Sequence, residues 1–481
     1  MNYSSHDMQD TIVALATPPG VGAIGVIRLS GPDAIRIVDE VFYGKNLQKQ
    51  DTHTMHFGTI RDGEKILDEV LVSLFVAPKS YTGENVVEVS CHGSNYILQK
   101  VIQLFIIKGA RSAQPGEFTM RAFLNGRMDL SQAEAVADLI ASDSAGSHQM
   151  AMSQMRGGIS TEIEKLREEL INFASLIELE LDFGEEDVEF ANRDDLRQLI
   201  LKIQGFISSL LSSFDLGNAI KQGVLTVIAG RPNAGKSTLL NAMLNEERAI
   251  VSDIAGTTRD TIEEVLNING VHFRLIDTAG IRDAQDQIEA IGVEKTMQKV
   301  AQASLLLYVF DVTGMTLEEV QQDLTRLHRD EMTTIVVCNK MDRNPYFDPK
   351  KLKDLLANGQ RLIANSPPKD QRPKTKDQLT ISLSAKNGMN IPYLKEVLYN
   401  AVLEDKNFTD TAIVSNARHF EALQKTSTSL DRVLEGMDNA ITGDFLAMDI
   451  RKALYHLGEI TGKVDVEELL GNIFGKFCIG K

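Results

Sequence analysis

The chain has 481 residues, 43% of them hydrophobic, which is enough material for several packed domains. Its formal net charge of −17 excludes a protein that holds nucleic acid on a broad basic face, because such binding depends on neutralising phosphate groups. The three cysteines are far apart in the sequence and form no Cys-x-x-Cys pair, so neither a disulfide framework nor a zinc site is indicated.

Residues 1–126 predict a small α+β domain, because strand-like runs alternate with glycine and proline punctuation. Three polar residues stand out: Arg28 in an apolar strand, Glu88 in the run 86–89, and Arg127 after the turn Asn125-Gly126. Taken alone, each is typical of a surface or strand-edge position. Strands are expected at 11–16, 25–29, 69–75 and 86–91, and helices at 32–42 and 96–108.

Helical periodicity takes over in residues 127–222 and resumes in residues 404–481. Ser131 followed by Glu134 matches a capping box and marks a helix start. Because the two helical stretches bracket a segment of different character, we expect one discontinuous helical domain with a globular insert.

The insert, residues 223–403, begins with a β-branched run that ends in Gly-x-x-x-x-Gly-Lys-Ser and continues as a helical pattern. Gly230 and Gly235 let backbone N–H groups converge on phosphate oxygens, Lys236 reaches the β- and γ-phosphates, and Ser237 offers a hydroxyl to Mg²⁺. Further strands at 261–268, 271–276, 305–312, 334–338 and 379–383 predict a doubly wound sheet, with a hairpin at Asn269-Gly270.

Further short motifs follow in the order typical of GTPases: Gly-Thr-Thr-Arg-Asp at 256–260, Asp-Thr-Ala-Gly at 277–280, Asn-Lys-Met-Asp at 339–342 and Ser-Ala-Lys at 384–386. Thr258 would add a second hydroxyl to Mg²⁺, Asp277 would hold the metal through water, and the Gly280 amide would sense the γ-phosphate. Asp342 can accept two hydrogen bonds that guanine offers and adenine does not, so GTP is favoured. The predicted nucleotide contacts are Asn233, Ala234, Gly235, Lys236, Ser237, Thr238, Ser252, Asp253, Ile254, Ala255, Gly256, Thr257, Thr258, Asp277, Thr278, Ala279, Gly280, Asn339, Lys340, Asp342, Ser384, Ala385 and Lys386.

Residue 281 departs from Ras-like enzymes, which place a glutamine directly after Asp-x-x-Gly to orient the attacking water. Ile281 cannot do this, so a polar residue of the segment 282–294 must, and that segment offers Asp283, Asp286 and Glu289.

Asn233, within the phosphate loop, carries an oxygen suited to a monovalent cation beside the phosphates. With backbone carbonyls near Ser252 and Ile254, it would place charge where other enzymes use an arginine finger. The alternative is that Asn233 merely suits the turn of the loop, and the residues leave both interpretations open.

No apolar run approaches the length of a membrane span, and residues 1–10 lack the basic region of a secretory signal. We therefore expect a cytoplasmic protein with no membrane span.

Several short sequences are specific beyond these general patterns: Ala-Thr-Pro-Pro-Gly at 16–20, Pro-Gly-Glu-Phe at 115–118, Arg-Ala-Phe-Leu-Asn at 121–125, the phosphate loop at 230–237, and the terminal Phe-Cys-Ile-Gly-Lys at 477–481. In these the chain closely resembles the bacterial MnmE (TrmE) tRNA-modification GTPases along its whole length. The terminal pentapeptide is the most specific of them.

The resemblance implies an N-terminal α+β domain (1–126) that dimerises and binds 5-formyl- or methylene-tetrahydrofolate. It also implies a discontinuous helical domain (127–222 and 404–481) and an inserted Ras-like G domain (223–403) activated by K⁺ and by G-domain dimerisation. Carried over by motif, Glu289 is the water-orienting glutamate and Cys478 a catalytic cysteine of debated role. The binding residues are Arg28, Glu88, Arg127 and Lys481 for folate, Asn233, Ser252, Ile254 and Thr257 for K⁺, and Ser237 and Thr258 for Mg²⁺.

The folate assignment carries two expectations. Arg28, Arg127 and Lys481 would bind the carboxylate tail and Glu88 the pterin ring, although many relatives have lysine at 127, which keeps the charge but not the hydrogen-bond geometry. Lys481 reaches the N-terminal domain only if the last segment of the chain returns to it.

The resemblance further implies that the chain acts with the flavoprotein MnmG (GidA), as a heterotetramer, to place an aminomethyl or carboxymethylaminomethyl group at C5 of the wobble uridine of certain tRNAs. The acidic composition fits a protein that leaves much of the tRNA contact to that partner. The alternative is a non-catalytic GTP switch in ribosome assembly. Such GTPases end in a basic RNA-binding module, whereas this chain ends in an acidic helical block and Cys-Ile-Gly-Lys.

Overall fold

A computed structural model describes residues 10–182, 192–245, 263–277, 303–327, 332–352, 379–403, 413–439, 441–464, 477 and 480. The chain divides into two compact units. One comprises Met1–Ala141, Ala151–Leu211 and Ala417–Lys481, and the other Ser142–Met150 and Ser212–Asn416. Most of the two helical stretches therefore lies in one unit. The residue bounds given above for the four segments stay a prediction.

The first unit contains a sheet of seven described strands in the order β3-β4-β5-β6-β2-β1-β7. Neighbouring strands are antiparallel except β1 and β7, which are parallel. The strands are β1 (Ile12–Leu15), β2 (Ile24–Ser30), β3 (Phe42–Tyr43), β4 (Thr54–Asp62), β5 (Lys65–Phe75), β6 (Val86–His92) and β7 (Arg111–Ser112), and the helices are α1 (Ala34–Asp39), η1 (Leu47–Lys49), α2 (Asn95–Ile107) and α3 (Glu117–Leu124).

Helices α1 and α2 cover one face of this sheet, because both bury apolar side chains in the same cluster as alternate strand residues. In β2, Ile27 and Leu29 enter that core, while Arg28 between them belongs to the opposite face. The α+β character predicted for this domain is confirmed. Strand β4 was not predicted, since its polar residues and Gly58 mask the alternation that its pairing with β5 reveals.

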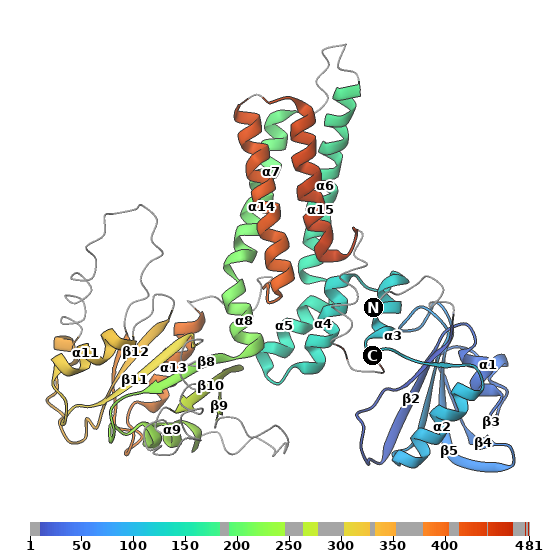
Figure 1. Cartoon of the computed structure of the whole chain (residues 1–481), viewed down its shortest axis with the longest axis horizontal. Helices are drawn as coiled ribbons and strands as arrows, with labels where there is room; N and C mark the ends of the chain where they lie inside the picture. Colours follow the sequence, from blue (N-terminus) through green and yellow to red (C-terminus); the bar gives the residue numbers. More distant parts are fainter. Residues whose placement is uncertain are drawn as a thin grey trace, which may run out of the picture. The chain divides into compact units, whose positions relative to one another are not determined.

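Helices from both halves of the sequence form the rest of the first unit. In Figure 1, α6 and α7 lie beside α14 and α15, and side chains join them: Gln204 donates to Asp431 at 2.7 Å, and Arg451 Nε to Glu178 at 2.7 Å. The discontinuous helical domain is thus confirmed. The helices of the first unit are α4 (Leu130–Ala141), α6 (Gly158–Asp182), α7 (Arg193–Ser212), α14 (Ala417–Asp438) and α15 (Gly443–Thr461), while α5 (Ala145–Met155) is divided between the two units.

The capping box predicted at Ser131 and Glu134 is wrong. The box is formed two residues earlier, where the Gln132 backbone N–H donates to Asp129 Oδ1 and the Asp129 N–H donates to Gln132 Oε1, both at 2.9 Å. Ser131 lies inside the helix and donates its hydroxyl to Asp129 at 2.7 Å.

Glu134 instead joins the two halves of the helical domain. Arg418 donates to both carboxylate oxygens, at 3.0 and 2.9 Å, and His419 Nε2 lies 2.8 Å from Oε2. Burial raises the pKa of Glu134, but the hydrogen bonds from His419 and Arg418 outweigh it and lower the pKa to about 2. A buried carboxylate thus holds the start of α14 against α4.

The second unit contains a sheet of six described strands in the order β13-β12-β11-β8-β10-β9. All neighbours are parallel except β9, which pairs antiparallel with β10 through the predicted hairpin at Asn269-Gly270. The strands are β8 (Val224–Ala229), β9 (Glu263–Ile268), β10 (Val271–Asp277), β11 (Leu305–Asp311), β12 (Thr333–Asn339) and β13 (Leu379–Ser382).

Helices cover both faces of this sheet, as a doubly wound fold requires. α9 (Lys236–Asn245) and α13 (Ile391–Leu403) pack in one hydrophobic cluster, and α11 (Leu317–Leu327) packs in another on the opposite face. Cys338 is fully buried in β12, as expected of a strand residue. α8 (Phe214–Gln222) leads into β8. The predicted Ras-like doubly wound insert is confirmed.

One described helical stretch, Arg193–Gln222, has the length and composition of a membrane span. Its first part, α7, buries Leu196, Ile200 and Ile203 in the helical domain, as core helices of bundles do. No clear membrane span is therefore found among the described residues.

The Glu134 cluster yields a prediction. Because the folded-state pKa is below the ordinary value of 4.5, Glu134 contributes stability that is present above about pH 4.5 and is lost as pH falls toward 2. Glu134→Gln should lower the free energy of unfolding by on the order of 2–3 kcal/mol near neutral pH. Urea unfolding followed by circular dichroism, from pH 7 to pH 4, measures this. The difference in the free energy of unfolding between wild type and Glu134→Gln should be constant down to pH 5 and should become smaller below pH 4.5.

Glu421→Gln is the matched control, because Glu421 is exposed on α14 and pairs with Lys425. Its effect should be within about 0.5 kcal/mol. An equal loss in both variants would contradict a special role for Glu134.

Candidate functional site

The described parts of the predicted nucleotide motifs lie along one edge of the sheet in the second unit. β8, β10, β12 and β13 run parallel, so their carboxyl ends lie at the same edge of the sheet. The phosphate loop follows β8, Asp277 ends β10, Asn339 ends β12, and Ser384 lies two residues after the end of β13. Described motif residues that are far apart in the sequence therefore lie close together in the structure.

Glycine is required at both ends of the phosphate loop. Gly230 has φ +151°, and a Cβ there would lie 2.0 Å from the Val309 carbonyl oxygen of β11. Gly235 has φ +96°, and a Cβ there would lie 2.3 Å from the Asn339 amide nitrogen. A side chain at either position would push the loop away from its neighbours, so the tight curl depends on both glycines.

Lys236 lies inside this curl. Its ammonium donates to the carbonyl oxygens of Gly230 at 3.0 Å and Arg231 at 3.2 Å, and the residue is 8% exposed. α9 begins at the same residue, with Ser237 and Thr238 exposed beside it. An anion entering the loop meets the lysine cation and the positive end of a helix together, which fits a polyphosphate.

Asn339 joins the phosphate loop to the segment that follows β13. Its side-chain nitrogen donates to the Ala234 carbonyl at 2.8 Å, and its side-chain oxygen accepts the Ala385 N–H at 3.0 Å. The residue is 2% exposed, so these bonds are shielded from water. Segments more than a hundred residues apart thus form one rigid surface.

The neighbouring charged residues are also oriented. Lys340, with φ +66°, donates to the Asn233 carbonyl and to Asp311 Oδ2, both at 2.7 Å. Ser384 donates its hydroxyl to Asp342 at 2.6 Å, and this bond keeps the pKa of the exposed Asp342 below its ordinary value. Asp342 is therefore an ionised acceptor with a fixed direction, as the recognition of guanine N1–H and its amine requires.

The described part of the predicted site comprises 233–238, Asp277, Asn339, Lys340, Asp342, Ser384, Ala385 and Lys386. Asn233 has φ +62° and is exposed, so it does suit a turn, and this leaves its role as a cation ligand untested. Outside the described residues lie Ser252, Asp253, Ile254, Ala255, Gly256, Thr257, Thr258, Thr278, Ala279, Gly280, Glu289, Cys478 and Lys481.

Sequence reasoning missed Asp311 and the side chain of Arg231. Asp311 ends β11, which pairs with β12, and it reaches Lys340 because its cross-strand partner is Asn339. Arg231 donates to Glu319 and Asp323 of α11. A charged residue at the end of a parallel strand was the available signal for Asp311, and no local signal exists for Arg231.

The first unit holds the second group of predicted residues. Arg28 and Glu88 are cross-strand partners on β2 and β6, and their side chains form an ion pair with Nη2 and Nε at 2.8 and 2.9 Å from Oε1. The guanidinium lies 5.7 Å from the ring centres of both Tyr81 and Phe118. Both charged side chains stay partly exposed, so they can meet a ligand together.

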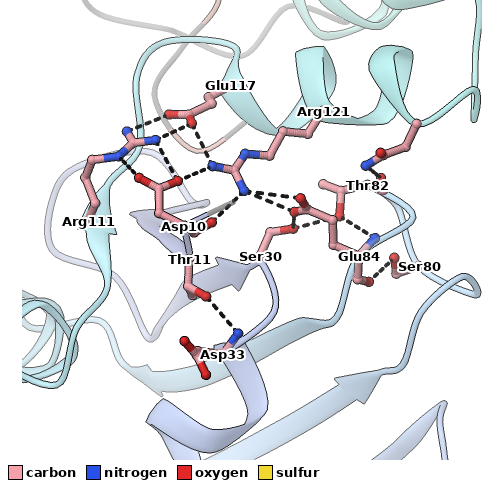
Figure 2. A network of polar contacts seen from close by, with 11 residues as sticks. Asp10, Thr11, Ser30, Asp33, Ser80, Thr82, Glu84, Arg111, Glu117 and Arg121 are labelled. Atoms are coloured by element: carbon pink, nitrogen blue, oxygen red, sulfur yellow. Dashed lines mark hydrogen bonds and ion pairs between the residues drawn. The ribbon is translucent and has the colours of Figure 1, made fainter. Parts of the chain in front are cut away.

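A buried charge network holds the elements that carry those rings (Figure 2). Arg121 of α3 is 1% exposed and reaches Asp10 at 2.8 Å, Glu117 at 3.0 Å and Glu84 at 3.2 Å. Arg111 pairs with Asp10 and Glu117 from the other side. Burial raises the pKa of Asp10, but hydrogen bonds from Arg111 and Arg121 outweigh it and lower the pKa. The network fixes α3 and the 80–84 turn against the sheet.

The end of the chain returns to this domain. Phe477 is buried with Met120 and Leu130, and a Cβ on Gly480 would lie 2.1 Å from the Leu15 carbonyl oxygen. Arg28 Nη1 lies 3.5 Å from the Gly480 carbonyl oxygen. The last segment therefore reaches the N-terminal domain of the same chain, as the expected role of Lys481 requires. Arg127 is exposed, and its side chain borders Gly83 in the turn that carries Tyr81.

The described cysteines do not add a reactive group. Burial raises the pKa of Cys91, and likewise that of Cys338, to about 12, so neither thiol ionises at neutral pH.

Comparison with known protein families gives matches to both units. A family model described as GTP-binding protein TrmE N-terminus matches residues 11–127, and one described as MnmE helical domain matches residues 130–478.

Curated relatives match nearly end to end. A Cytophaga hutchinsonii protein named tRNA modification GTPase MnmE is 55% identical over 472 residues, covering 98% of this chain and 98% of its own length. Proteins of the same name are 53% identical over 484 residues in Christiangramia forsetii and 52% identical over 478 residues in Bacteroides thetaiotaomicron, each covering 98% of this chain and 100% of the relative.

Proposed function

The chain belongs to the MnmE (TrmE) family of tRNA modification GTPases, as its motifs predicted, and we propose that it is a K⁺-dependent member that modifies the wobble uridine of certain tRNAs. GTP hydrolysis in tRNA modification follows from membership of the family. The further content of the proposal is the MnmG (GidA) partner and the addition of an aminomethyl or carboxymethylaminomethyl group at C5, with a tetrahydrofolate as one-carbon source.

The observation that carries the proposal is the shared edge of the doubly wound sheet. The phosphate loop with Lys236 follows β8, and Asp342, oriented by Ser384, follows β12 two strands away, with Asn339 joined to both sides. These groups suit one ligand that has a polyphosphate at one end and a guanine at the other. Mg²⁺ would be held by Ser237 and Thr258, with Asp277 acting through water.

For hydrolysis, we assign the orientation of water to Glu289 and the extra positive charge to K⁺ at Asn233, Ser252, Ile254 and Thr257. Support comes from the apolar Ile281 and from the family motif. In the described part of the loop, Arg231 donates hydrogen bonds to α11, so its side chain does not point toward the phosphates. A cation from solution is then the simplest source of charge for the transition state.

For the folate, the ion pair between Arg28 and Glu88 changes the assignment of roles. Arg28 and Glu88 lie 2.8 Å apart, so they would contact the same end of a ligand. Together they suit the edge of a pterin that carries hydrogen-bond donors and acceptors, with Tyr81 and Phe118 as apolar walls. Arg127 and Lys481 remain for the carboxylate tail. A bound reduced folate would supply the one-carbon unit.

For the partners, an exposed apolar face supports a homodimer through the N-terminal domain. Phe57 and Leu71 are cross-strand partners on β4 and β5, 67% and 41% exposed, and Met55 beside them is 63% exposed. Three large apolar side chains on one sheet face are costly to leave in water, so a second copy is the expected cover. The charge of −17 supports tRNA contact mainly through MnmG.

Nucleoside analysis of tRNA from a strain without this protein tests the proposal. The C5-modified wobble uridines should be absent and ribosomal subunits normal. Wild-type protein should restore the modification and Lys236→Ala should not, because the loop then lacks its cation. Lys350→Ala, at an exposed position of the same unit, is the control. Normal tRNA with accumulated ribosome precursors would instead support the assembly switch.

K⁺ dependence gives a second prediction. GTP turnover should be at least about tenfold faster in K⁺ than in Na⁺ at matched ionic strength, because an oxygen cage sized for K⁺ fits Na⁺ poorly. Asn233→Ala should remove the difference. Equal wild-type rates in the two salts would rule out the cation site.

Removing the last residues tests the folate assignment. Because Phe477 belongs to the hydrophobic core, the chain should be cut after it, deleting residues 478–481. Calorimetry should show weaker binding of 5-formyltetrahydrofolate and tRNA modification should be lost, while K⁺-stimulated GTP hydrolysis stays within about twofold of wild type. Undiminished folate affinity would show that the terminal residues are no part of the pocket.

A further inference from the structure

Arg231, the residue after the first glycine of the phosphate loop, sends its side chain away from the phosphates to α11. Nε and Nη2 contact the two carboxylate oxygens of Asp323 at 2.9 and 3.4 Å, and Nη1 donates to Glu319 at 2.6 Å. The Asp323 contact is a two-point fork, which fixes direction as well as distance.

Both acceptors are held by groups of their own. The hydroxyl of Tyr308, a residue only 1% exposed, donates to Asp323 Oδ2 at 2.8 Å. Glu319 accepts the Thr316 N–H at 3.0 Å while its own N–H donates to the Thr316 hydroxyl at 3.3 Å, which is the capping box of α11. The arginine is thus attached to a buried tyrosine and to the start of a helix.

The backbone carbonyl of Arg231 contacts Lys236. The Arg231 carbonyl accepts the Ala234 N–H at 3.3 Å and the Lys236 ammonium at 3.2 Å. Pro232 follows and restricts the backbone of Arg231 to extended conformations. Arg231 therefore contacts α11 through its side chain and Lys236 through its backbone carbonyl.

A solvated ion pair is the competing explanation, since Arg231 and Glu319 side chains are 36% and 40% exposed and such pairs contribute little. Three features decide against it: the fork to Asp323, the buried Tyr308 that holds Asp323, and the backbone contacts of the same arginine to the lysine of the loop.

We propose that Arg231 is a positioning residue for guanine-nucleotide binding, which holds the first turn of the phosphate loop on α11 so that Lys236 and the loop N–H groups are preorganised for the phosphates. This inference rests on the proposed GTPase function and assigns to it a residue outside the nucleotide contacts. Arg231 acts through the loop and touches no reacting atom.

The test measures the affinity of the full-length chain for fluorescent GDP and for a non-hydrolysable GTP analogue, with kcat and KM for GTP. Arg231→Ala should raise Kd and KM about fivefold to tenfold and leave kcat within about twofold, because preorganisation acts on binding. The Kd and KM of Arg231→Lys should lie between those of wild type and Arg231→Ala, because lysine keeps the charge but cannot make the two-point contact with Asp323. Glu318→Gln, one residue from Glu319 and exposed on α11, is the control and should bind like wild type.

A double-mutant cycle separates positioning from general stability. Arg231→Ala and Asp323→Asn break the same clamp, so the double variant should bind no more weakly than the weaker single variant. Additive losses, or unchanged affinity with a lowered melting temperature, would overturn the inference. If wild type binds guanine nucleotide and all variants equal it, this inference alone fails. A wild-type chain that binds no guanine nucleotide would overturn the proposed function itself.

Discussion

Contact between backbone and backbone at Gly230 is the constraint on which the nucleotide site depends. The loop leaves β8 so close to β11 that any Cβ would overlap the Val309 carbonyl, and this directs the chain over the edge of the sheet. Gly235 then packs against the side-chain amide of Asn339, whose bonds to Ala234 and Ala385 join the phosphate loop to the segment that follows β13. This surface is thus preorganised by backbone packing at Gly230 and by the side-chain bonds of Asn339, before any ligand contact is made.

Buried charge has a different task in the first unit, where it joins segments far apart in the sequence. Arg121 connects α3 to Asp10 and Glu84, and Glu134 connects α4 to Arg418 near the start of the second helical stretch. Buried ions are costly without partners, so each cluster penalises any arrangement in which one segment is absent. A domain interrupted by an inserted GTPase gains specificity from such contacts, because no short loop holds its halves together.

The ion pair of Arg28 and Glu88 depends both on backbone packing and on buried charge. Its position depends on the register of β2 and β6, its apolar walls come from α3 and the 80–84 turn, and those walls are held by the Arg121 network. The returning C-terminal segment places Gly480 beside the same arginine. The Arg28–Glu88 pair, for which we propose folate binding, therefore lies beside both the N-terminal sheet and Gly480 from the end of the chain.

Local spacing in the sequence was enough to predict most of the helices and strands, the order of the nucleotide motifs and the family. The clearest case is the strand, glycine loop and helix in the span 224–245, followed by fixed short motifs after later strands. The sequence also determined that those motifs meet, since parallel strands end at one edge. Local patterns failed where two choices satisfy the same rule. Asp129 with Gln132 and Ser131 with Glu134 both fit a capping box, and only packing against α14 shows that Glu134 belongs to Arg418. Strand register paired Arg28 with Glu88, and the position of α11 gave Arg231 its partners. Such contacts join residues from about sixty to nearly three hundred positions apart, so only the tertiary structure decides them.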